Sequence, residues 1–360
     1  MMEKSVEQAL LKVVDANTGI DLVSSKTVSQ IKTDGNNVSV LIALPYPAKS
    51  QWKTLEKQIV DALQHIPGIG RISVSIASAI KAHKVQGALR PMSNVKNIIA
   101  VASGKGGVGK STVATNLALA LSEEGANVGI LDADLYGPSQ PIMLGLDKRP
   151  ESSDGQTFDP LEKYGIQLMS IGLMINPDEP VIWRAPVATQ ALIQLLEKTN
   201  WKNLDYLIID LPPGTGDIQL TLSQRIPVTG AVIVTTPQDI ALSDAQKGLV
   251  MFDKVNIPVL GIIENMSLHV CSNCGHAETI FGESGAKKLS ETYGVEILGE
   301  LPLQRSIREQ GDAGMPPVVA DPNSEVSRIF MNMARRLAVR ISQKARDMGS
   351  RLPGVVVENT

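Results

Sequence analysis

The sequence GKGGVGKST, from Gly104 to Thr112, decides the fold of this 360-residue chain. An apolar run from Ile98 to Ala102 precedes it, and a helix-like segment from Val113 to Ser122 follows it. The nine residues match the pattern GxxxxGK[ST] in the strand, loop and helix context that a phosphate-binding loop requires. A glycine-rich turn without a ligand is the plainer interpretation, but the Lys110-Ser111 pair and both flanking segments argue against it.

The residue types of this loop suit a nucleoside triphosphate. Glycines let successive backbone N–H groups face phosphate oxygens, and the following helix adds its positive N-terminal end. Lys110 is expected to neutralise the β- and γ-phosphates, Ser111 to ligate Mg²⁺ and Thr112 to add a phosphate contact. The predicted ATP-binding residues are Gly104, Lys105, Gly106, Gly107, Val108, Gly109, Lys110, Ser111 and Thr112. The chain is therefore expected to be an ATPase that uses Mg²⁺.

Two further apolar runs end in carboxylates, Asp132 with Asp134 and then Asp210. Ligands of open α/β sheets bind at the carboxyl ends of the strands, so these side chains are expected to surround the loop. Asp210 suits an outer-shell magnesium role, while Asp132 and Asp134 orient the attacking water or hold the metal, with no assignment between the two. Asp217 either responds to the γ-phosphate or is simply solvated.

Short apolar runs alternate with helical stretches through the rest of the chain, at residues 98–102, 128–131, 206–209, 231–234 and 259–263. That alternation is typical of a buried parallel sheet. The predicted fold class is therefore α/β, with a mainly parallel sheet flanked by helices over residues 95–360 and a small N-terminal α+β domain. The length of the chain also favours two domains.

The first 77 residues read as helix, strand, strand, helix, strand. Residues 5–14 are helix-like, residues 27–32 and 38–44 form a hairpin, and residues 72–76 form the last strand. Ser50 is expected to cap the second helix, and Pro67-Gly68 to end it. Residues 78–94 lack apolar periodicity and are interpreted as an interdomain linker long enough to permit movement.

Composition excludes some classes of partner. The net charge is −3 with a pI near 5.9, so no global attraction to nucleic acid or to an anionic membrane is expected. No run of about 18 apolar residues exists, and the charged residues 1–7 do not resemble a signal peptide. We therefore expect a cytoplasmic protein without stable membrane insertion and without a nucleic-acid partner.

Lys105 is a second lysine inside the loop. With this lysine and the acidic motifs, the sequence resembles the ParA/MinD-like ATPases, whose deviant phosphate loop carries a signature lysine at this place. The resemblance implies that Lys105 reaches the nucleotide of a partner subunit, so that ATP holds a homodimer together. A second ammonium beside Lys110 is poorly tolerated unless it finds additional phosphate charge. A solvated loop lysine is the alternative.

Asn265 follows the apolar run 259–263. In the ParA/MinD-like group the matching asparagine hydrogen-bonds the adenine, which suits its paired donor and acceptor. The resemblance implies this role for Asn265 and places Pro302, in Leu301-Pro302, in the base pocket.

The only two cysteines are Cys271 and Cys274, in a CxxC motif. Two thiolates can bind one metal but complete neither a tetrahedral site nor a [4Fe-4S] cluster, so a second subunit must supply the missing pair. A half zinc ribbon, a redox dithiol and an exposed turn are the other interpretations. His269 and His276 are close enough in sequence to join a one-chain zinc site, although so short a loop strains tetrahedral geometry.

The loop, its extra lysine and CxxC after the adenine motif together resemble the Mrp/ApbC iron–sulfur cluster carrier ATPases over residues 95–345. The N-terminal unit resembles the MIP18-like domain fused to bacterial members, with residues 44–51 fitting its loop. Two positions depart from the family pattern. Ser272-Asn273 replaces the usual Pro-x between the cysteines, and Trp183-Arg184-Ala185-Pro186 replaces Trp-Arg-Gly-Pro.

A C-terminal stripe has two interpretations. Its apolar members are Val326, Ile329, Phe330, Met333, Leu337 and Ile341, and its basic neighbours are Arg335, Arg336, Arg340, Lys344 and Arg346. A membrane-surface helix is one interpretation. Packing of the stripe on the ATPase core is favoured, because that is the commoner fate of such a helix.

The resemblance implies a carrier that binds a [4Fe-4S] cluster between two subunits and transfers it to apo-proteins. A donor scaffold supplies the cluster, and slow ATP hydrolysis gates the process. The alternative is a ParA/MinD-like nucleotide switch with a structural zinc at the CxxC dimer interface. A DNA-segregation role shares the ATPase core but leaves CxxC without a use.

Overall fold

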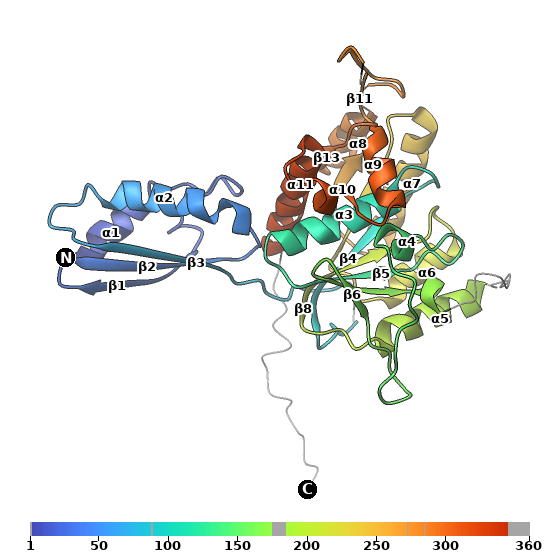
Figure 1. Cartoon of the computed structure of the whole chain (residues 1–360), viewed down its shortest axis with the longest axis horizontal. Coiled ribbons are helices and arrows are strands. Elements are labelled where there is room, and N and C mark those ends of the chain that lie inside the picture. The colour runs from blue at the N-terminus through green and yellow to red at the C-terminus, as the bar shows by residue number, and fades with distance from the viewer. Residues whose placement is uncertain (1, 88, 175–184, 272, 284, 345–360) are drawn as a thin grey trace, which may run out of the picture.

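The computed structural model describes residues 2–87, 89–174, 185–271, 273–283 and 285–344. Figure 1 shows a small N-terminal unit at the left and a large unit at the right, joined by one narrow region. The predicted fold class is confirmed, since the large unit is a mainly parallel sheet between helices and the small unit is α+β.

The large sheet has eight strands in the order β13-β10-β9-β4-β8-β5-β7-β6. All neighbouring strands are parallel except β6 and β7, which form an antiparallel edge pair. The strands are β4 (Val95–Ala102), β5 (Val128–Asp132), β6 (Leu161–Lys163), β7 (Ile166–Ser170), β8 (Leu204–Asp210), β9 (Gly230–Thr235), β10 (Val259–Glu264) and β13 (Ile297–Glu300). Each of the five apolar runs predicted from the sequence lies in one of these strands.

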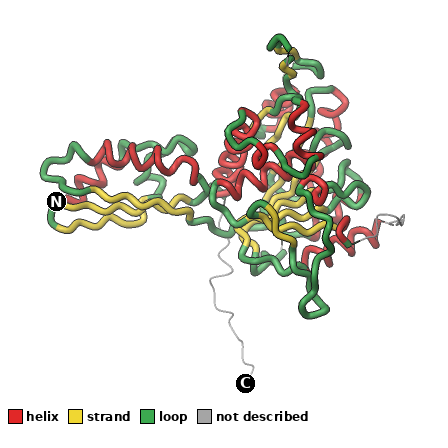
Figure 2. The backbone as a smooth tube through the Cα atoms, viewed as in Figure 1, coloured by secondary structure: helices red, strands yellow, loops and turns green. Residues whose placement is uncertain are grey.

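Helices cover both faces of this sheet (Figure 2). Alternate residues of one strand point to opposite faces, so Ile99 packs in the cluster with α3 and α11, while Ile98 packs in the cluster with α5 and α7. The helices are α3 (Lys110–Glu123), α4 (Gln140–Met143), α5 (Ala185–Lys198), α6 (Asp217–Arg225), α7 (Asp239–Lys254), α8 (Gly285–Tyr293), α9 (Arg305–Asp312), α10 (Pro317–Ala320) and α11 (Glu325–Ser342), with the 3₁₀ turn η2 (Ile171–Leu173). The doubly covered sheet explains why its strands read as continuous apolar runs.

The small unit has the predicted order helix, strand, strand, helix, strand. Its elements are α1 (Met2–Leu10), β1 (Val28–Asp34), β2 (Asn37–Leu44), η1 (Lys49–Gln51), α2 (Trp52–Leu63) and β3 (Ile72–Ser78). Strand β2 is central, antiparallel to β1 and parallel to β3. The periodic residues Leu55, Ile59 and Leu63 of α2 are buried, as their spacing predicts.

Ser50 does not cap α2, so that prediction was wrong. Ser50 lies inside η1, α2 begins at Trp52, and its N-cap residue Gln51 makes no side-chain cap hydrogen bond. The Ser50 hydroxyl donates instead to the carboxylate of Glu124 at 2.8 Å, across the junction with the large unit. A tertiary partner for the hydroxyl has displaced the local capping bond that the sequence favoured.

The segment between the two units is attached to the large one. His83 and Gln86 are buried, the ring Nδ1 of His83 lies 2.9 Å from Asn97 Oδ1, and the side-chain amide of Gln86 donates to the Ser223 carbonyl at 2.8 Å. These contacts attach His83 and Gln86 to the large unit, so this part of the segment is not a free linker.

Helix α11 packs its apolar stripe into the core. Val326, Phe330, Met333, Leu337 and Ile341 are all buried against the sheet face that α3 also covers. The favoured interpretation of this stripe is confirmed. The apolar residues that a membrane-surface helix would present to lipid are buried in the core instead. Within the part of the chain that the structure describes, no helix is long and apolar enough to cross a membrane.

Candidate functional site

The loop predicted to bind phosphate lies between β4 and α3, at the carboxyl ends of the strands. Gly107 and Gly109 both have a φ of +83°, a left-handed conformation that side chains with a Cβ rarely adopt. A Cβ atom at Gly104 would collide with the backbone carbonyl of Asp244 in α7. These glycines are needed for the loop to curl in front of α3 and to lie close to α7.

The loop forms one wall of a cavity of about 400 Å³. Its lining residues are Ser103, Lys105, Gly106, Gly107, Gly109, Lys110, Ser111, Thr112, Asp134, Ser139, Ile142, Met143, Pro213 and Asp312. Seven of the nine predicted loop residues thus line one cavity beside the N-terminus of α3. This arrangement suits a polyphosphate, because loop amides and the helix dipole both favour negative charge there.

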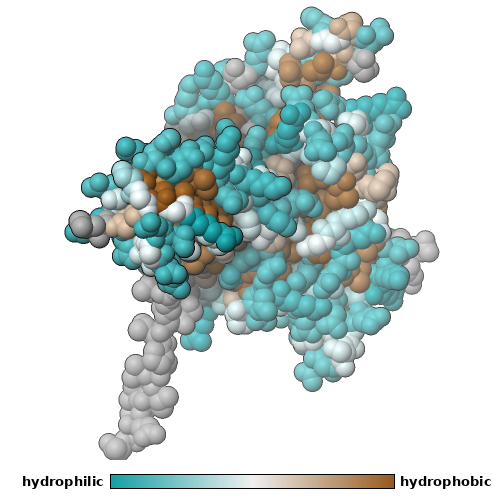
Figure 3. All heavy atoms as spheres, turned by 60° about the vertical axis from the view of Figure 1, so that its left-hand side comes forward, coloured by the Kyte–Doolittle hydropathy of each residue, from teal (hydrophilic) through white to brown (hydrophobic). Residues whose placement is uncertain are grey.

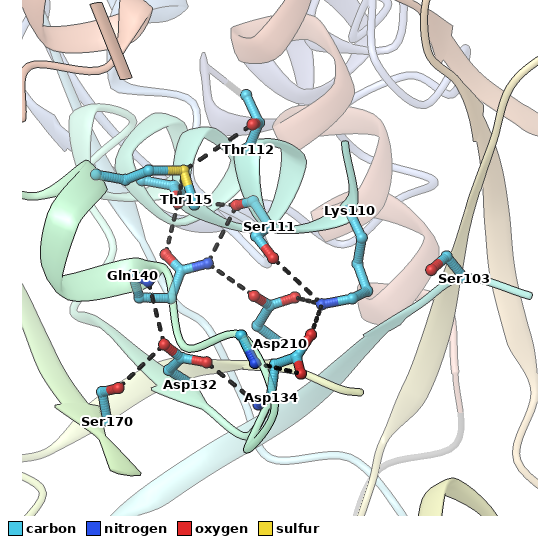
Figure 4. Close-up of polar contacts among 12 residues, drawn as sticks. Ser103, Lys110, Ser111, Thr112, Thr115, Asp132, Asp134, Gln140, Ser170 and Asp210 are labelled. Atoms are coloured by element: carbon cyan, nitrogen blue, oxygen red, sulfur yellow. Dashed lines mark hydrogen bonds and ion pairs between the residues drawn. The ribbon is translucent and has the colours of Figure 1, made fainter. Parts of the chain in front are cut away.

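Lys110 is buried and forms an ion pair with Asp210, as Figure 4 shows. Its ammonium also lies 3.7 Å from a carboxylate oxygen of Asp134. Parallel register explains the meeting, since Val101 on β4 and Asp132 on β5 both pair with Asp210 on β8. The predicted gathering of carboxylates around Lys110 is present in the structure.

Gln140, at the start of α4, connects these groups and was not anticipated from the sequence. Its side-chain amide donates to Asp210 at 2.9 Å and to the carbonyl of Ser111 at 3.1 Å (Figure 4). Its side-chain oxygen accepts a bond from Thr115 at 2.5 Å. A glutamine after Gly-Pro-Ser carries no recognisable signal, so only the fold could reveal this connection.

Asp132 and Asp134 occupy different places. Asp132 is fully buried and accepts hydrogen bonds from Ser170 at 3.0 Å and from the backbone N–H of Gln140 at 3.1 Å. Burial, and then the nearby Asp210 charge, raise the pKa of Asp132 to about 7. Burial also raises the pKa of Asp134, against the opposing effect of Lys110. Asp134 lines the cavity, whereas Asp132 is not among the cavity-lining residues.

Ser139 is a second residue that sequence reasoning missed. It lines the cavity, and its hydroxyl oxygen is buried without a hydrogen-bond partner among the described residues. Buried polar atoms in native proteins nearly always have a partner. The hydroxyl therefore has hydrogen-bonding capacity that no described residue uses, in the cavity that Lys110 and Asp134 also line.

Lys105 and Asp217 are both exposed. Lys105 lines the outer part of the cavity, and its ammonium makes no ion pair with any described residue. Asp217 is the first residue of α6, and its carbonyl accepts a bond from Thr221. Neither side chain is committed to a contact within the described part of this chain.

Asn265 contacts the loop directly. Its side-chain amide donates to the carbonyl of Val108 at 2.9 Å, and its side-chain oxygen accepts from the N–H of Met266. The segment that contains Pro302 lies alongside, because Ser267 donates to the Leu301 carbonyl at 2.9 Å. The structure thus brings Asn265 and the Leu301-Pro302 segment to the same side of the phosphate loop.

The two cysteines lie on a small hairpin of β11 (His269–Val270) and β12 (Ala277–Glu278), which projects at the top of Figure 1. The N–H of Cys271 donates to the His276 carbonyl, and the N–H of Gly275 donates to the Cys271 carbonyl, both at 2.9 Å. Backbone N–H groups of Asn273 and Cys274, and then the Cys274 side chain, lower the pKa of Cys271. Cys271 is half-buried and Cys274 is exposed.

Neither nearby histidine joins the cysteines. His269 Nδ1 lies 3.1 Å from the carbonyl oxygen of Leu303, which fastens the base of the hairpin, and His276 is exposed. No group of three or more His, Cys, Asp or Glu side chains in the described ranges is placed to hold a metal ion. The described chain thus offers two free cysteine side chains near the tip of the hairpin, one half-buried and one exposed.

Exposed apolar side chains lie along and beside the base of this hairpin. Leu268, Val270 and Ile280 are 36%, 38% and 52% exposed. Figure 3 shows hydrophobic surface at the base of the projecting hairpin, at the top of the view. Apolar surface around a polar tip is typical of a protein contact site.

Three of the positions discussed in the sequence analysis lie outside the described residues. Two of them are Trp183-Arg184, in the segment that departs from the Trp-Arg-Gly-Pro pattern, and Ser272 between the cysteines. Arg346, predicted as a basic neighbour of the C-terminal stripe, is the third.

Comparisons with known proteins agree with this geometry. Residues 94–338 match the family model of the NUBPL iron-transfer P-loop NTPases, and residues 3–76 match that of an iron–sulfur cluster assembly protein. An iron–sulfur cluster carrier protein of Haemophilus influenzae is 49% identical over 340 residues, which are 94% of this chain and 92% of the relative.

Two solved structures show the same fold for the large unit. A nucleotide-binding protein of Archaeoglobus fulgidus, solved with ADP, is 37% identical with a TM-score of 0.57 and covers 66% of this chain and 93% of its own. The cell division ATPase MinD of Pyrococcus furiosus, 24% identical with a TM-score of 0.51, covers 67% of this chain and 98% of its own. The family match, the relative of matching length and the loop with its paired carboxylates lead to one conclusion: this chain belongs to the NUBPL iron-transfer P-loop NTPases.

Proposed function

We propose that this protein is an ATP-dependent iron–sulfur cluster carrier, which binds a [4Fe-4S] cluster between two copies of the chain and transfers it to apo-proteins. The observation that carries the proposal is the direct connection between the phosphate loop and the segment that leads to the cysteines, made by Asn265 and Val108. The carrier name of the Haemophilus influenzae relative supports the choice of cargo.

ATP and Mg²⁺ occupy the cavity in this proposal. The donor set fits a magnesium nucleotide, because a hydroxyl (Ser111), carboxylates (Asp134 and Asp210) and an ammonium (Lys110) meet beside loop amides. Ser111 would hold the metal, with Asp210 behind it, and the metal would neutralise phosphate charge. Asp134, which lines the cavity, is better placed than Asp132 to orient the attacking water. Hydrolysis is expected to be slow.

The homodimer completes both sites. One chain offers two thiolates, whereas a [4Fe-4S] cluster takes four, so a two-fold axis through the hairpins would supply the set. The exposed side chains of Leu268, Val270 and Ile280 supply apolar surface for that contact. The unpaired ammonium of Lys105 would reach the phosphates in the partner subunit, where it finds opposite charge.

Coupling between nucleotide and cluster runs along a short path. The Val108 carbonyl accepts a hydrogen bond from the side chain of Asn265, and the N–H of Ser267 donates to the carbonyl of Leu301. The Leu303 N–H then donates to the Leu268 carbonyl at 2.8 Å, at the base of the hairpin. Closure of the dimer around ATP would shift this path and the geometry of the thiolates.

The other assignments follow from this role. We propose that residues 1–77 are a docking domain, residues 78–94 its linker and residues 95–360 the ATPase domain. The partners are a donor scaffold and apo-proteins in the cytoplasm, with no nucleic acid.

Anaerobic reconstitution with iron and sulfide, followed by metal analysis of the purified dimer, tests the proposal. About four irons per dimer and a brown absorbance are expected, and both should be lost in Cys271→Ala and Cys274→Ala. His276→Ala, on the same hairpin, is the matched control and should keep the cluster. Stoichiometric zinc without iron would favour the structural-zinc switch, and iron binding that survives both cysteine changes would overturn the carrier assignment.

A further inference from the structure

Two helices start beside the nucleotide cavity: α3 ends at a contact with the small unit, and α6 ends at a contact with Gln86 in the segment that joins the two units. Helix α3 begins at Lys110 and runs for 14 residues, which corresponds to about 21 Å. Helix α6 begins at Asp217, just after the loop whose Pro213 lines the cavity, and ends at Arg225. Packed helices move as rigid bodies, so a shift at one end of such a helix is felt at the other.

Glu124, the C-cap residue of α3, holds the small unit. Its side chain is fully buried, and its carboxylate accepts the Ser50 N–H at 3.0 Å and the Ser50 hydroxyl at 2.8 Å. The same carboxylate pairs with Arg335 of α11, and the Glu124 carbonyl accepts the Lys49 N–H at 3.1 Å. One residue therefore ties η1 of the small unit, α11 and the end of the phosphate-loop helix together.

A contact of this kind has two states rather than a continuous range. A carboxylate at zero exposure is tolerated only while its donors remain in place, because an unpaired buried charge is costly. Displacement of Lys49 and Ser50 removes two donors from the Glu124 carboxylate and one from its carbonyl, and it admits water. The small unit is then either seated on Glu124 or released from it.

Gln86 makes the second connection. Its side-chain amide donates to the Ser223 carbonyl at 2.8 Å and to the Ile226 carbonyl, both at the C-terminal end of α6. The side-chain oxygens of Gln86, Gln219 and Ser223 are buried without partners among the described residues. This interface has unused hydrogen-bonding capacity, so another arrangement can satisfy it at least as well.

We propose that the contact of the small unit with Glu124, and the contact of the joining segment with α6 through Gln86, are coupled to the nucleotide through α3 and α6, so that the small unit reports which nucleotide is bound. The proposal rests only on the ATP-binding part of the proposed function. Coupling between two binding equilibria is reciprocal. A change that weakens the contact of the small unit with Glu124 must therefore change nucleotide affinity by the same factor by which nucleotide changes that contact.

Hydrogen exchange on the full-length chain tests the coupling in one direction. Exchange of the Lys49 and Ser50 amides, which donate to Glu124, is measured without nucleotide, with Mg-ADP and with a non-hydrolysable Mg-ATP analogue. The exchange rates of these amides are expected to differ by about fivefold or more between the Mg-ADP state and the state with the Mg-ATP analogue. Exchange in residues 104–112 is followed in the same samples and reports nucleotide binding itself.

A variant tests the reciprocal direction. Ser50→Ala removes the hydroxyl that donates to the Glu124 carboxylate, and Ser50 does not line the cavity. The variant should therefore alter the ratio of the affinities for the ATP analogue and for ADP by about fivefold. Ser73→Ala is the matched control, because Ser73 is exposed on β3 of the same small unit and its loss should leave the ratio unchanged. Gln86→Ala should alter the ratio through α6 in the same way.

The outcomes separate the two proposals. Unchanged exchange at residues 104–112 would show that no nucleotide binds and would remove the ATP part of the proposed function. Slowed exchange at residues 104–112, with identical exchange at Lys49 and Ser50 in both nucleotide states and an unaltered ratio in both variants, would overturn the coupling alone.

Discussion

The side-chain amide of Asn265 donates a hydrogen bond of 2.9 Å to the carbonyl of Val108, in the middle of the phosphate loop. Six residues after Asn265 the chain reaches Cys271, at the tip of the hairpin. A residue that the family resemblance assigns to adenine therefore also holds the loop backbone. The phosphate loop is thus bonded to the segment of chain that leads to the cysteines.

Asn265→Ala should weaken nucleotide binding by about tenfold, because the Val108 carbonyl loses its donor in a buried place. Titration with a fluorescent ATP analogue measures the change. Asn323→Ala, at an exposed position, is the control and should bind normally. Normal affinity in Asn265→Ala would mean that the contact holds neither the loop nor the base.

Lys105→Ala should keep nucleotide binding but lower turnover by at least about tenfold, because the missing ammonium acts on phosphates in the partner subunit. Lys110→Ala should abolish binding, since Lys110 lies inside the cavity. Phosphate release measured over a range of protein concentrations checks the first variant, with Lys148→Ala as an exposed control. Unchanged turnover in Lys105→Ala would remove its role between subunits.

Ser139→Ala should lower kcat by about tenfold and change KM little, if the free hydroxyl bonds the reacting phosphate or its metal. Ser139→Thr keeps the hydroxyl and should restore part of the rate. Steady-state kinetics of both variants, with Ser153→Ala in an exposed loop as the control, provide the measurement. Equal kcat in Ser139→Ala and the original protein would contradict the expectation.

Glu264→Gln should change how stability depends on pH. Burial raises the pKa of Glu264 in the folded chain, and its carboxylate accepts the Ala286 N–H at 2.7 Å. The folded state then holds the proton to higher pH than the unfolded state, so stability from this group is full below the ordinary glutamate pKa of 4.5 and is lost as pH rises through the raised value.

The neutral glutamine has no proton to lose, and its oxygen can still accept the bond. Relative to the original protein, Glu264→Gln should therefore gain stability as pH rises above about 4.5. Urea unfolding at several pH values checks this, with the exposed Glu162→Gln as control. A stability difference that stays constant with pH would show that Glu264 titrates normally.

Much of the fold followed from local patterns. Apolar runs placed five strands of the large sheet, because strands covered on both faces exclude polar residues at every position. Spacing also predicted the buried face of α2 and of α11. The cap assigned to Ser50 failed because its partner, Glu124, lies 74 residues further along the chain. Gln140 and Ser139 were missed because neither residue type nor spacing marks them.

By itself the sequence determined the kind of chemistry that this protein can perform. The glycines, Lys110 and Ser111 specify a phosphate-binding loop through local backbone conformation and charge, and the cysteine pair predicts thiolate ligation. Only the tertiary structure decided which groups meet. Strand register brings Asp210 to Lys110, the crossing of distant segments brings Asn265 to Val108, and Glu124 binds Ser50 across the junction, because side chains far apart in sequence become neighbours only when the core packs.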